Sequence, residues 1–345
     1  MNASIGNRER KSSMGRISIK HKLIRSLGEV ALVLPFLVAG LWFAVTQPLW
    51  QSDKITVSSS ISPERLQAHV RKLSAELPPR TFPDNLDASA AYIREQWAAF
   101  GKVQDLPFAV DGETYHNLSI TFGSETPTRI VIGAHYDAYD ELPGADDNAS
   151  GIAGLLELAR LLSQVPLTQQ VELVAFTLEE PPYFRTANMG SAVHAKKLLE
   201  NGDKVELMIA LEMIGYYDDT PHSQDFPLPL MEYAYSNRGN FIAVVGNLSS
   251  MGIVRDTKAS MRRVMAMPVY SINAPWLIPG IDFSDHLNFW QQGFPALMIT
   301  DTAFYRNHAY HHREDTWERL DYTKMAEVVT GVFAVILDRA SAVKP

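Results

Sequence analysis

The chain contains no cysteine among its 345 residues. Without cysteine there can be no disulfide bond, no thiolate zinc site, no cysteine nucleophile and no lipid anchor attached to a cysteine. The absence leaves the redox state of the compartment open.

Positive charge is scarce after residue 28, although the net charge of the whole sequence is only −8. Residues 1–28 hold seven basic side chains and one acidic side chain, which leaves 24 basic and 38 acidic residues for the rest. The remainder therefore carries a net charge of −14. A body this acidic is a poor partner for the phosphate backbone of nucleic acids, so we expect no nucleic-acid partner.

No charged residue lies between Val30 and Ser52, and the first part of this run is almost wholly apolar. A helix needs about 20 apolar residues to cross a bilayer, and upstream basic residues favour a cytoplasmic N-terminus. We therefore predict a cytoplasmic tail over 1–28, a single transmembrane anchor over 29–50, a linker over 51–62 and a domain over 63–345. That domain would lie outside the cytoplasm, in the periplasm, attached to the inner or plasma membrane. A cleaved signal peptide is the alternative.

Downstream of the linker, apolar strand patterns alternate with helical patterns. We predict strands at 103–110, 115–122, 130–134, 171–178, 205–214, 241–245, 269–273 and 295–300. We predict helices at 63–77, 87–100, 189–200, 256–265, 286–292 and 324–339, and one more after residue 151. This alternation indicates an α/β fold of three layers, α/β/α, with a mostly parallel central sheet and helices on both faces.

The stretch from Arg129 to Gly151 combines a buried strand with polar side chains. The strand runs into His135-Tyr136-Asp137, and Asp147 follows twelve residues after His135, before an apolar helical pattern. Open α/β sheets form their sites at the carboxyl ends of the strands. Taken alone, a His-x-Asp pair there is more often a structural hydrogen-bonded pair than a metal site.

Three more polar clusters follow predicted strands. Glu179 and Glu180 come after the strand at 171–178, Glu212 interrupts an apolar run, and His311 lies in the loop after 295–300. Each of these alone could belong to a solvated turn, but a buried acid needs a partner.

Taken together, the strand ends would deliver two imidazoles and three carboxylates to one edge of the sheet. This set suits two divalent ions of the zinc type, bridged by one carboxylate, with room for a water molecule. The predicted ligands are His135, Asp147, Glu180, Glu212 and His311. Glu179 would remain as a base beside the water.

This combination of motifs resembles the co-catalytic, di-zinc aminopeptidases, a family related to glutamate carboxypeptidase and glutaminyl cyclase. The resemblance covers Pro63 to Ala340. It rests on Gly-Ala-His-Tyr-Asp, Pro-Gly-Ala-Asp-Asp-Asn-Ala-Ser-Gly, the Glu-Glu pair, Glu-Met-Ile-Gly, Ser-Asp-His and Tyr-His-x-x-x-Asp-Thr.

The resemblance implies a role for each matching residue. One Zn²⁺ would be held by His135 and Glu212, the other by Glu180 and His311, with Asp147 rather than Asp146 as the bridge. Glu179 would be the general base, Asp137 would orient His135 from behind, and Tyr310 is the candidate to stabilise the oxyanion.

Two further matches are less specific. Asp285 and His286, in Ser-Asp-His, are predicted to position a pocket wall, although Ser284 could equally be a helix cap. The family most often has Asp where Glu212 stands, so other divalent ions are possible at the His135/Glu212 site.

The implied activity is that of a membrane-anchored zinc exopeptidase, an aminopeptidase that hydrolyses N-terminal residues from peptides with a metal-activated water. Three alternatives remain open: a glutaminyl cyclase-like enzyme, a carboxypeptidase and a non-catalytic, receptor-like module. A carboxypeptidase would need a cation for the substrate carboxylate, and Arg185 and Arg306 lie near the motifs. The side-chain preference and the oligomeric state do not follow from the sequence.

Overall fold

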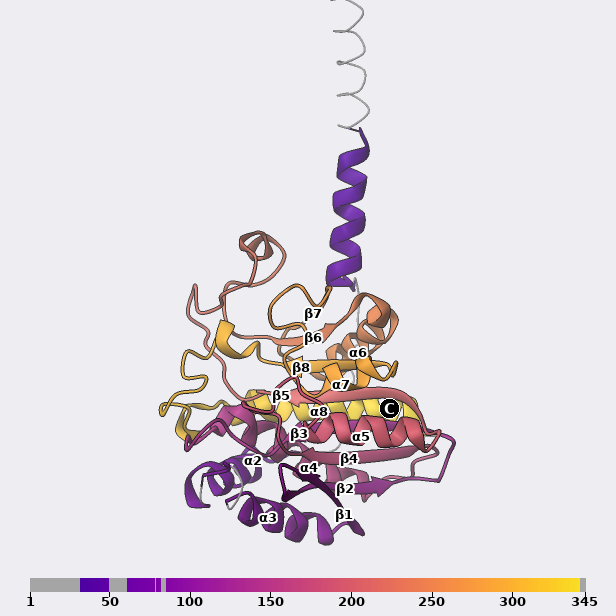
Figure 1. Cartoon of the computed structure of the whole chain (residues 1–345). Coiled ribbons are helices and arrows are strands. Elements are labelled where there is room, and N and C mark those ends of the chain that lie inside the picture. Colours follow the sequence, from indigo (N-terminus) through magenta and orange to yellow (C-terminus); the bar gives the residue numbers. More distant parts are fainter. Residues whose placement is uncertain (1–31, 50–60, 78, 82–84, 342–345) are drawn as a thin grey trace, which may run out of the picture. The chain divides into compact units, whose positions relative to one another are not determined.

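The computed structural model describes residues 32–49, 61–77, 79–81 and 85–341 (Figure 1). The chain divides into two units, one ending at Val45 and the other beginning at Thr46. The predicted tail over 1–28 lies outside the described residues, as does most of the predicted linker over 51–62.

The described part of the first unit is helical, in a helix that spans residues 32–46 and so ends at the first residue of the second unit. Large apolar side chains are exposed along this helix, among them Leu32, Phe36, Leu37 and Leu41. Within the part of the chain that the structure describes, no helix combines the length and the apolar character required to cross a membrane.

The second unit is built on one sheet of eight strands, which run in the order β1-β2-β4-β3-β5-β8-β6-β7. Their bounds are β1 Val103–Val110, β2 Glu113–Phe122, β3 Thr128–His135, β4 Gln170–Phe176, β5 Lys204–Glu212, β6 Ile242–Gly246, β7 Val269–Asn273 and β8 Ala296–Thr300. The central strands β4, β3, β5 and β8 are parallel to one another, and β6 is parallel to β7. The β1/β2, β2/β4 and β6/β8 pairs are antiparallel. The predicted mostly parallel sheet is thereby confirmed.

Helices cover both faces of this sheet, so the three-layer prediction is also confirmed. On one face lie α2 Pro63–Arg71, α3 Leu86–Ala98, α4 Gly151–Leu162, α6 Met251–Val264 and α8 Tyr322–Ala340. On the other face lie α5 Gly190–Glu200 and α7 His286–Gln291, both in front of the sheet in Figure 1. Successive strand residues point to opposite faces, so Ile130 and Ile132 join the first core while Val131 joins the second.

Side-chain caps mark where two of the helices begin, and the sequence analysis predicted one of these caps. The Ser62 side chain accepts a hydrogen bond from the Arg65 N–H at the start of α2, as predicted for a cap, and Pro63 follows it. The Asp321 side chain caps α8 by accepting from two main-chain N–H groups. As a result α8 begins at Tyr322 rather than at the predicted Lys324.

Gly133 lies on β3, two residues before the strand ends at His135, and the structure leaves no room for a side chain there. A Cβ atom at this position would lie 2.2 Å from Cε2 of the buried Phe176 ring. We expect Gly133→Ala to lower the free energy of unfolding by about 1–3 kcal/mol through overpacking. The thermal unfolding midpoint measures this change.

A matched control is Gly252→Ala on α6, where an added Cβ would meet nothing within 4 Å. This variant should be neutral or slightly more stable, because alanine favours a helix by about 0.5–1 kcal/mol over glycine. Equal midpoints for the two variants would mean that the Phe176 ring yields without cost.

Candidate metal centre

The predicted polar residues do meet at the carboxyl ends of the central strands. His135 is the last residue of β3 and Glu212 the last of β5, while Glu179 and Glu180 follow β4 closely. His311 arrives on the loop after β8, and Asp147 lies in the turn Ala145–Ser150 that precedes α4. Because these strands are parallel neighbours, their ends bring the side chains to one place.

The two carboxylate oxygens of Asp147 face opposite imidazoles. Asp147 Oδ1 lies 3.3 Å from His135 Nε2, and Asp147 Oδ2 lies 3.2 Å from His311 Nε2. Glu212 Oε2 lies 3.4 Å from His135 Nε2, and Glu180 Oε2 lies 3.2 Å from His311 Nε2. The geometry thus forms two half-sites, one with His135 and Glu212 and one with His311 and Glu180, that share Asp147.

Several atoms of this cluster are suited to bind divalent cations. His135 Nε2, His311 Nε2 and Glu180 Oε1 are buried side-chain atoms without a hydrogen-bond partner. Each half-site together with Asp147 offers three ligand atoms within 4.8 Å of one another. Imidazole nitrogens and carboxylate oxygens are ordinary zinc ligands, so the residues present fit a pair of such ions.

The buried acids of the cluster have pKa values shifted by burial and by one another. Burial raises the pKa of Glu180 to about 8, with a further contribution from Asp147. Burial likewise raises the pKa of Glu212, and raises that of Glu179 well above its usual value. Burial would lower the pKa of His135, but the carboxylates of Glu212 and Glu179 raise it well above its usual value. Acids and imidazoles alone can balance this charge only by holding extra protons.

Asp137 contacts His135 mainly through its main chain. The main-chain carbonyl of Asp137 accepts the hydrogen bond from His135 Nδ1, at 3.1 Å, while its carboxylate oxygen is 3.6 Å away. The carboxylate Oδ2 instead accepts the main-chain N–H of Glu180 at 3.0 Å. Asp137 therefore fixes the tautomer that leaves Nε2 free to bind a metal, and it also holds the strand end that carries Glu180.

The Ser-Asp-His motif contacts the cluster through Ser284. Ser284 Oγ donates to Glu212 Oε2 at 2.7 Å, and the N-cap residue of α7 is Asp285, so the alternative of a cap at Ser284 is wrong. Asp285 and His286 are buried at the start of α7, and His286 Nε2 contacts the Ile281 carbonyl at 2.8 Å. Burial raises the pKa of Asp285 to about 7 and lowers that of His286 to about 4. A role for these two residues in shaping a pocket wall would have to be indirect, through Ile281 and its neighbours.

A buried arginine that the sequence analysis missed holds the loop that carries Asp147. The guanidinium of Arg80 donates to the main-chain carbonyls of Tyr136 at 2.8 Å, Leu73 at 3.0 Å, Pro143 at 2.9 Å and Gly144 at 2.7 Å. The planar fork of arginine suits several acceptors at once. From the opposite side, Asp315 accepts the N–H of Asp147 at 3.1 Å.

Asp146, the neighbour of Asp147, points away from the two half-sites. Its Oδ1 accepts the N–H of Gly215 at 2.9 Å, and its Oδ2 accepts the Asn307 side chain at 3.0 Å. Burial and the nearby Asp301 raise the pKa of Asp146 well above its usual value. Asp146 thus contacts neither half-site, whereas Asp147 lies between the two.

Three residues beside the cluster have backbone conformations that L-amino acids rarely adopt. Leu178 (φ 60°) precedes Glu179, Met213 (φ 49°) follows Glu212, and His311 itself has φ 57°. Each such conformation costs on the order of 1–3 kcal/mol and persists only where the surroundings enforce it. Packing around the strand ends therefore aims these side chains.

His311 is held between two tyrosines, of which only Tyr310 was predicted to matter. The Tyr310 ring stacks on His311 with centroids 3.8 Å apart, and Tyr139 stacks on it at 4.2 Å. Tyr310 also lines the cleft beside the cluster, as do Glu179 and Phe283. Burial and the surrounding acids raise the pKa of Tyr310 above its usual value, so its hydroxyl keeps its proton.

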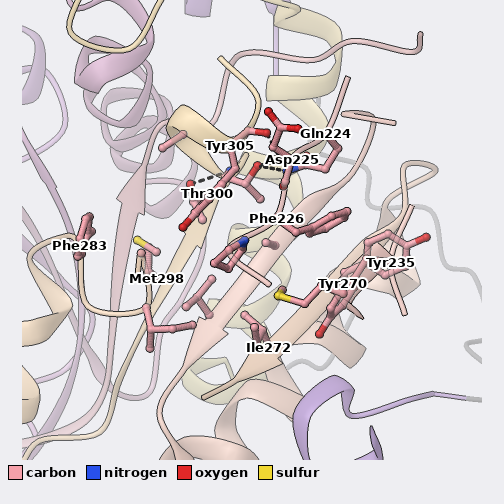
Figure 2. Close-up of a pocket in the computed structure, with 18 of the residues that line it drawn as sticks. Gln224, Asp225, Phe226, Tyr235, Tyr270, Ile272, Phe283, Met298, Thr300 and Tyr305 are labelled. Atoms are coloured by element: carbon pink, nitrogen blue, oxygen red, sulfur yellow. Dashed lines mark hydrogen bonds between the residues drawn. The ribbon is translucent and has the colours of Figure 1, made fainter. Parts of the chain in front are cut away.

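An apolar pocket of about 90 Å³ adjoins this cleft (Figure 2). It is lined mainly by aromatic and aliphatic side chains from β6, β7, β8 and the loops before β6, after β7 and after β8, with Phe226, Tyr235, Tyr270, Ile272 and Met298 among them. The pocket and the cleft share Glu212, Phe283, Ala303 and Phe304. A group bound at the cluster can therefore place an apolar substituent in the pocket.

Replacement of Arg80 tests how the site is supported. Arg80→Met leaves three buried carbonyls and one partly buried carbonyl without their donor, and each unsatisfied buried group costs about 1–3 kcal/mol. We expect a loss of at least about 2 kcal/mol in unfolding free energy and weaker metal retention. Arg313→Met, at an exposed arginine, is the control and should change neither quantity. Unchanged unfolding of Arg80→Met would show that water or nearby groups can replace the guanidinium.

Comparison with known proteins agrees with this geometry. A protein of Escherichia coli K12, the uncharacterized protein YfbL, is 52% identical over 301 residues, which cover 83% of this chain and 91% of that one. A probable aminopeptidase of Saccharomyces cerevisiae is 27% identical over 234 residues, which cover 64% of this chain and 55% of that one. The crystal structure of the Legionella pneumophila LapA aminopeptidase has a similar fold, with a TM-score of 0.65 at 18% identity over 82% of this chain and 72% of that one. The model of peptidase family M28 matches residues 117–336, and the chain belongs to this family.

Proposed function

We propose that this protein is a membrane-anchored, zinc-dependent aminopeptidase with two Zn²⁺ ions. One ion would be bound by His135 and Glu212, the other by His311 and Glu180, and Asp147 would bridge them. The observation that carries this assignment is the placement of the two Asp147 oxygens, 3.3 Å and 3.2 Å from the free nitrogens of two different histidines. A single-ion site would need only one of these contacts.

Bound zinc would supply Lewis acidity, which lowers the pKa of water towards about 7 and polarises a carbonyl group. The residues of the chain would move the protons. Glu179 Oε2 lies 3.9 Å from His135 Nε2 and lines the cleft, so it faces the space between the half-sites. We infer that it accepts the proton from the attacking water and delivers it to the nitrogen of the leaving amine.

The charges around the cleft favour a substrate with a free amino end. Glu179, Glu180 and Glu212 line the cleft and can attract an α-ammonium group. The two candidate cations for a substrate carboxylate both have partners within the protein. Arg306 is buried and donates to Gln224 and to the Phe241 carbonyl, each at 2.9 Å, although its Nη2 has no hydrogen-bond partner among the described residues. Arg185 is paired with Asp282. These contacts support an aminopeptidase over a carboxypeptidase.

The apolar pocket would accept the side chain of the first residue. It begins at Glu212 and Phe283 and is lined by Met298, Tyr270 and other apolar groups. Burying an aliphatic or aromatic side chain there contributes about 1.5–3 kcal/mol to binding. We therefore expect a preference for large apolar N-terminal residues.

The membrane anchor is a separate part of the proposal. Its support is the uncharged run from Val30 to Ser52, the seven basic residues before it and the exposed apolar side chains of the helix over 32–46. Such a segment suits a single span with a cytoplasmic N-terminus and the peptidase domain outside the cytoplasm.

Glu179→Gln tests the assignment of the base. Glutamine keeps the shape of the side chain but cannot accept the proton, so kcat should fall by about 10²–10⁴-fold. Zinc content should stay at the wild-type value. The assay is release of the first residue from peptides with free N-termini, with N-acetylated peptides as the negative control. An N-terminal glutamine peptide separates hydrolysis from cyclisation in the same assay.

Near-normal turnover of Glu179→Gln would remove Glu179 from the proton transfer. A parallel loss of zinc would instead assign it a ligand role. Hydrolysis of the acetylated peptides at the same rate as the free ones would contradict the aminopeptidase assignment.

Metal removal tests the cluster as a whole. A chelator should abolish activity, and Zn²⁺ should restore it. Since bound metal at a hundredfold excess over its Kd stabilises the fold by about 2.7 kcal/mol, we expect the unfolding midpoint to fall by about 5–10 °C without it. His311→Ala, which removes a ligand of only one half-site, should retain about one ion per chain by elemental analysis. Wild-type protein that binds one ion at saturation would contradict the pair.

A further inference from the structure

Two loops beside the apolar pocket expose large apolar side chains to solvent. The first loop, residues 226–235, exposes Leu230 at 77% and Tyr233 at 82%. The second loop, residues 274–281, exposes Trp276 at 67% and Leu277 at 68%. We call these four side chains the apolar rim. Exposed apolar groups gathered in this way mark interaction surfaces.

The rim residues lie on the outside of segments whose other residues line the pocket. The first loop contributes Phe226 and Tyr235 to the pocket, and the second contributes Pro279 and Ile281. Both loops therefore border the same opening, and the rim side chains are not needed to fill it. Packing within the domain gives no reason for these four large apolar side chains to be exposed.

The same edge of the domain receives the chain from the N-terminal helix. Thr46, the first residue of the domain, directly follows that helix unit, and its carbonyl accepts from Ser271 Oγ on β7 at 2.8 Å and from Lys258 Nζ at 2.8 Å. The carbonyl of Ser271 accepts the Tyr235 hydroxyl at 2.8 Å, which ties the first loop to the same residue. The second loop begins directly after β7.

Chain length limits how far the rim can be from this attachment point. Trp276 is five residues from Ser271, and an extended chain spans at most about 3.6 Å per residue, so about 18 Å separates them at most. Tyr233 is two residues from Tyr235. Thr46, the first residue of the domain, thus lies near the rim.

The composition of the rim suits a lipid surface rather than an ionic partner. Residues 274–281 carry no charge, and Glu232 is the only charged residue of 226–235. Tryptophan, tyrosine and leucine are the side chains that settle at the boundary between headgroups and acyl chains. An attraction to anionic lipid would instead require a cluster of lysine or arginine.

We propose that the apolar rim inserts into the headgroup boundary of the membrane that holds the N-terminal helix. The mouth of the apolar pocket would then open beside the bilayer. Peptides whose N-terminal residues partition into that boundary would reach the cleft without leaving the membrane surface. This inference rests on the proposed anchor, and the experiment below separates the two.

The absence of cysteine allows the test to be made in the full chain, because any introduced cysteine is the only thiol. Leu230→Cys and Leu277→Cys place a spin label on the rim. Leu199→Cys, an exposed leucine (48%) at the end of α5 just before β5 begins, is the matched control away from the site. Val38→Cys reports on the helix itself. The labelled proteins are placed in nanodiscs of zwitterionic phosphatidylcholine.

Accessibility of each label to oxygen, which concentrates in lipid, is compared with accessibility to a water-soluble nickel chelate. We expect the oxygen-to-nickel ratio at 230 and 277 to exceed that at 199 severalfold, and to be unaffected by salt. Ratios at 230 and 277 equal to that at 199, with a high ratio at 38, would overturn the rim proposal and leave the anchor intact. A low ratio at 38 would overturn the anchor and the rim proposal together.

A second copy of this chain is the competing occupant of the rim. In that case the labels at 230 would be shielded from both reagents and broadened by a label on the other copy. That result would overturn the lipid assignment. Each labelled variant should hydrolyse a soluble aminoacyl-p-nitroanilide at the wild-type rate, since neither Leu230 nor Leu277 lines the pocket or the cleft among the described residues.

Discussion

The concentration of buried negative charge at one edge of the sheet is the constraint on which the site depends. Asp147, Glu179, Glu180 and Glu212 are all buried around two imidazoles. At 4 Å, two like charges repel by about 4 kcal/mol in a protein environment of moderate polarity. The fold can keep such a group together only with protons or cations between the carboxylates. Bound divalent ions would meet this requirement in place of protons, so the carboxylates could stay ionised.

The surrounding structure acts mainly by fixing the main chain at the strand ends. Arg80 contacts carbonyl groups rather than the ligand carboxylates, and Asp315 contacts N–H groups of the loop that carries Asp147. Asp137 supports both His135 and the Glu180 backbone. Because the supports hold the backbone, the ligand side chains keep their free lone pairs. Arg80, Asp137 and Asp315 are therefore buried and charged although none of them is a predicted metal ligand.

The two halves of the sheet serve different purposes. The ends of β3, β4, β5 and β8 and their following loops supply the cluster. The apolar pocket is lined by β6, β7, part of β8 and the neighbouring loops, two of which carry the rim. Ser271 links three features on that second half: the attachment of Thr46, the first loop through Tyr235, and the pocket that it helps to line. In the proposed function, substrate choice and membrane position would therefore depend mainly on segments outside the cluster.

The sequence by itself determined the α/β class, the strand ends and the residues His135, Asp147, Glu180, Glu212 and His311 as one cluster. It could do so because strand patterns are local and parallel strands bring their carboxyl ends together. Only the tertiary structure decided that Asp137 acts through its carbonyl, that Ser284 donates to Glu212, and that Arg80 supports the Asp147 loop. It also decided that the two apolar loops flank one pocket beside Thr46. These contacts join residues far apart in the chain through main-chain atoms or packing, and neither leaves a periodic pattern or a characteristic spacing in the sequence.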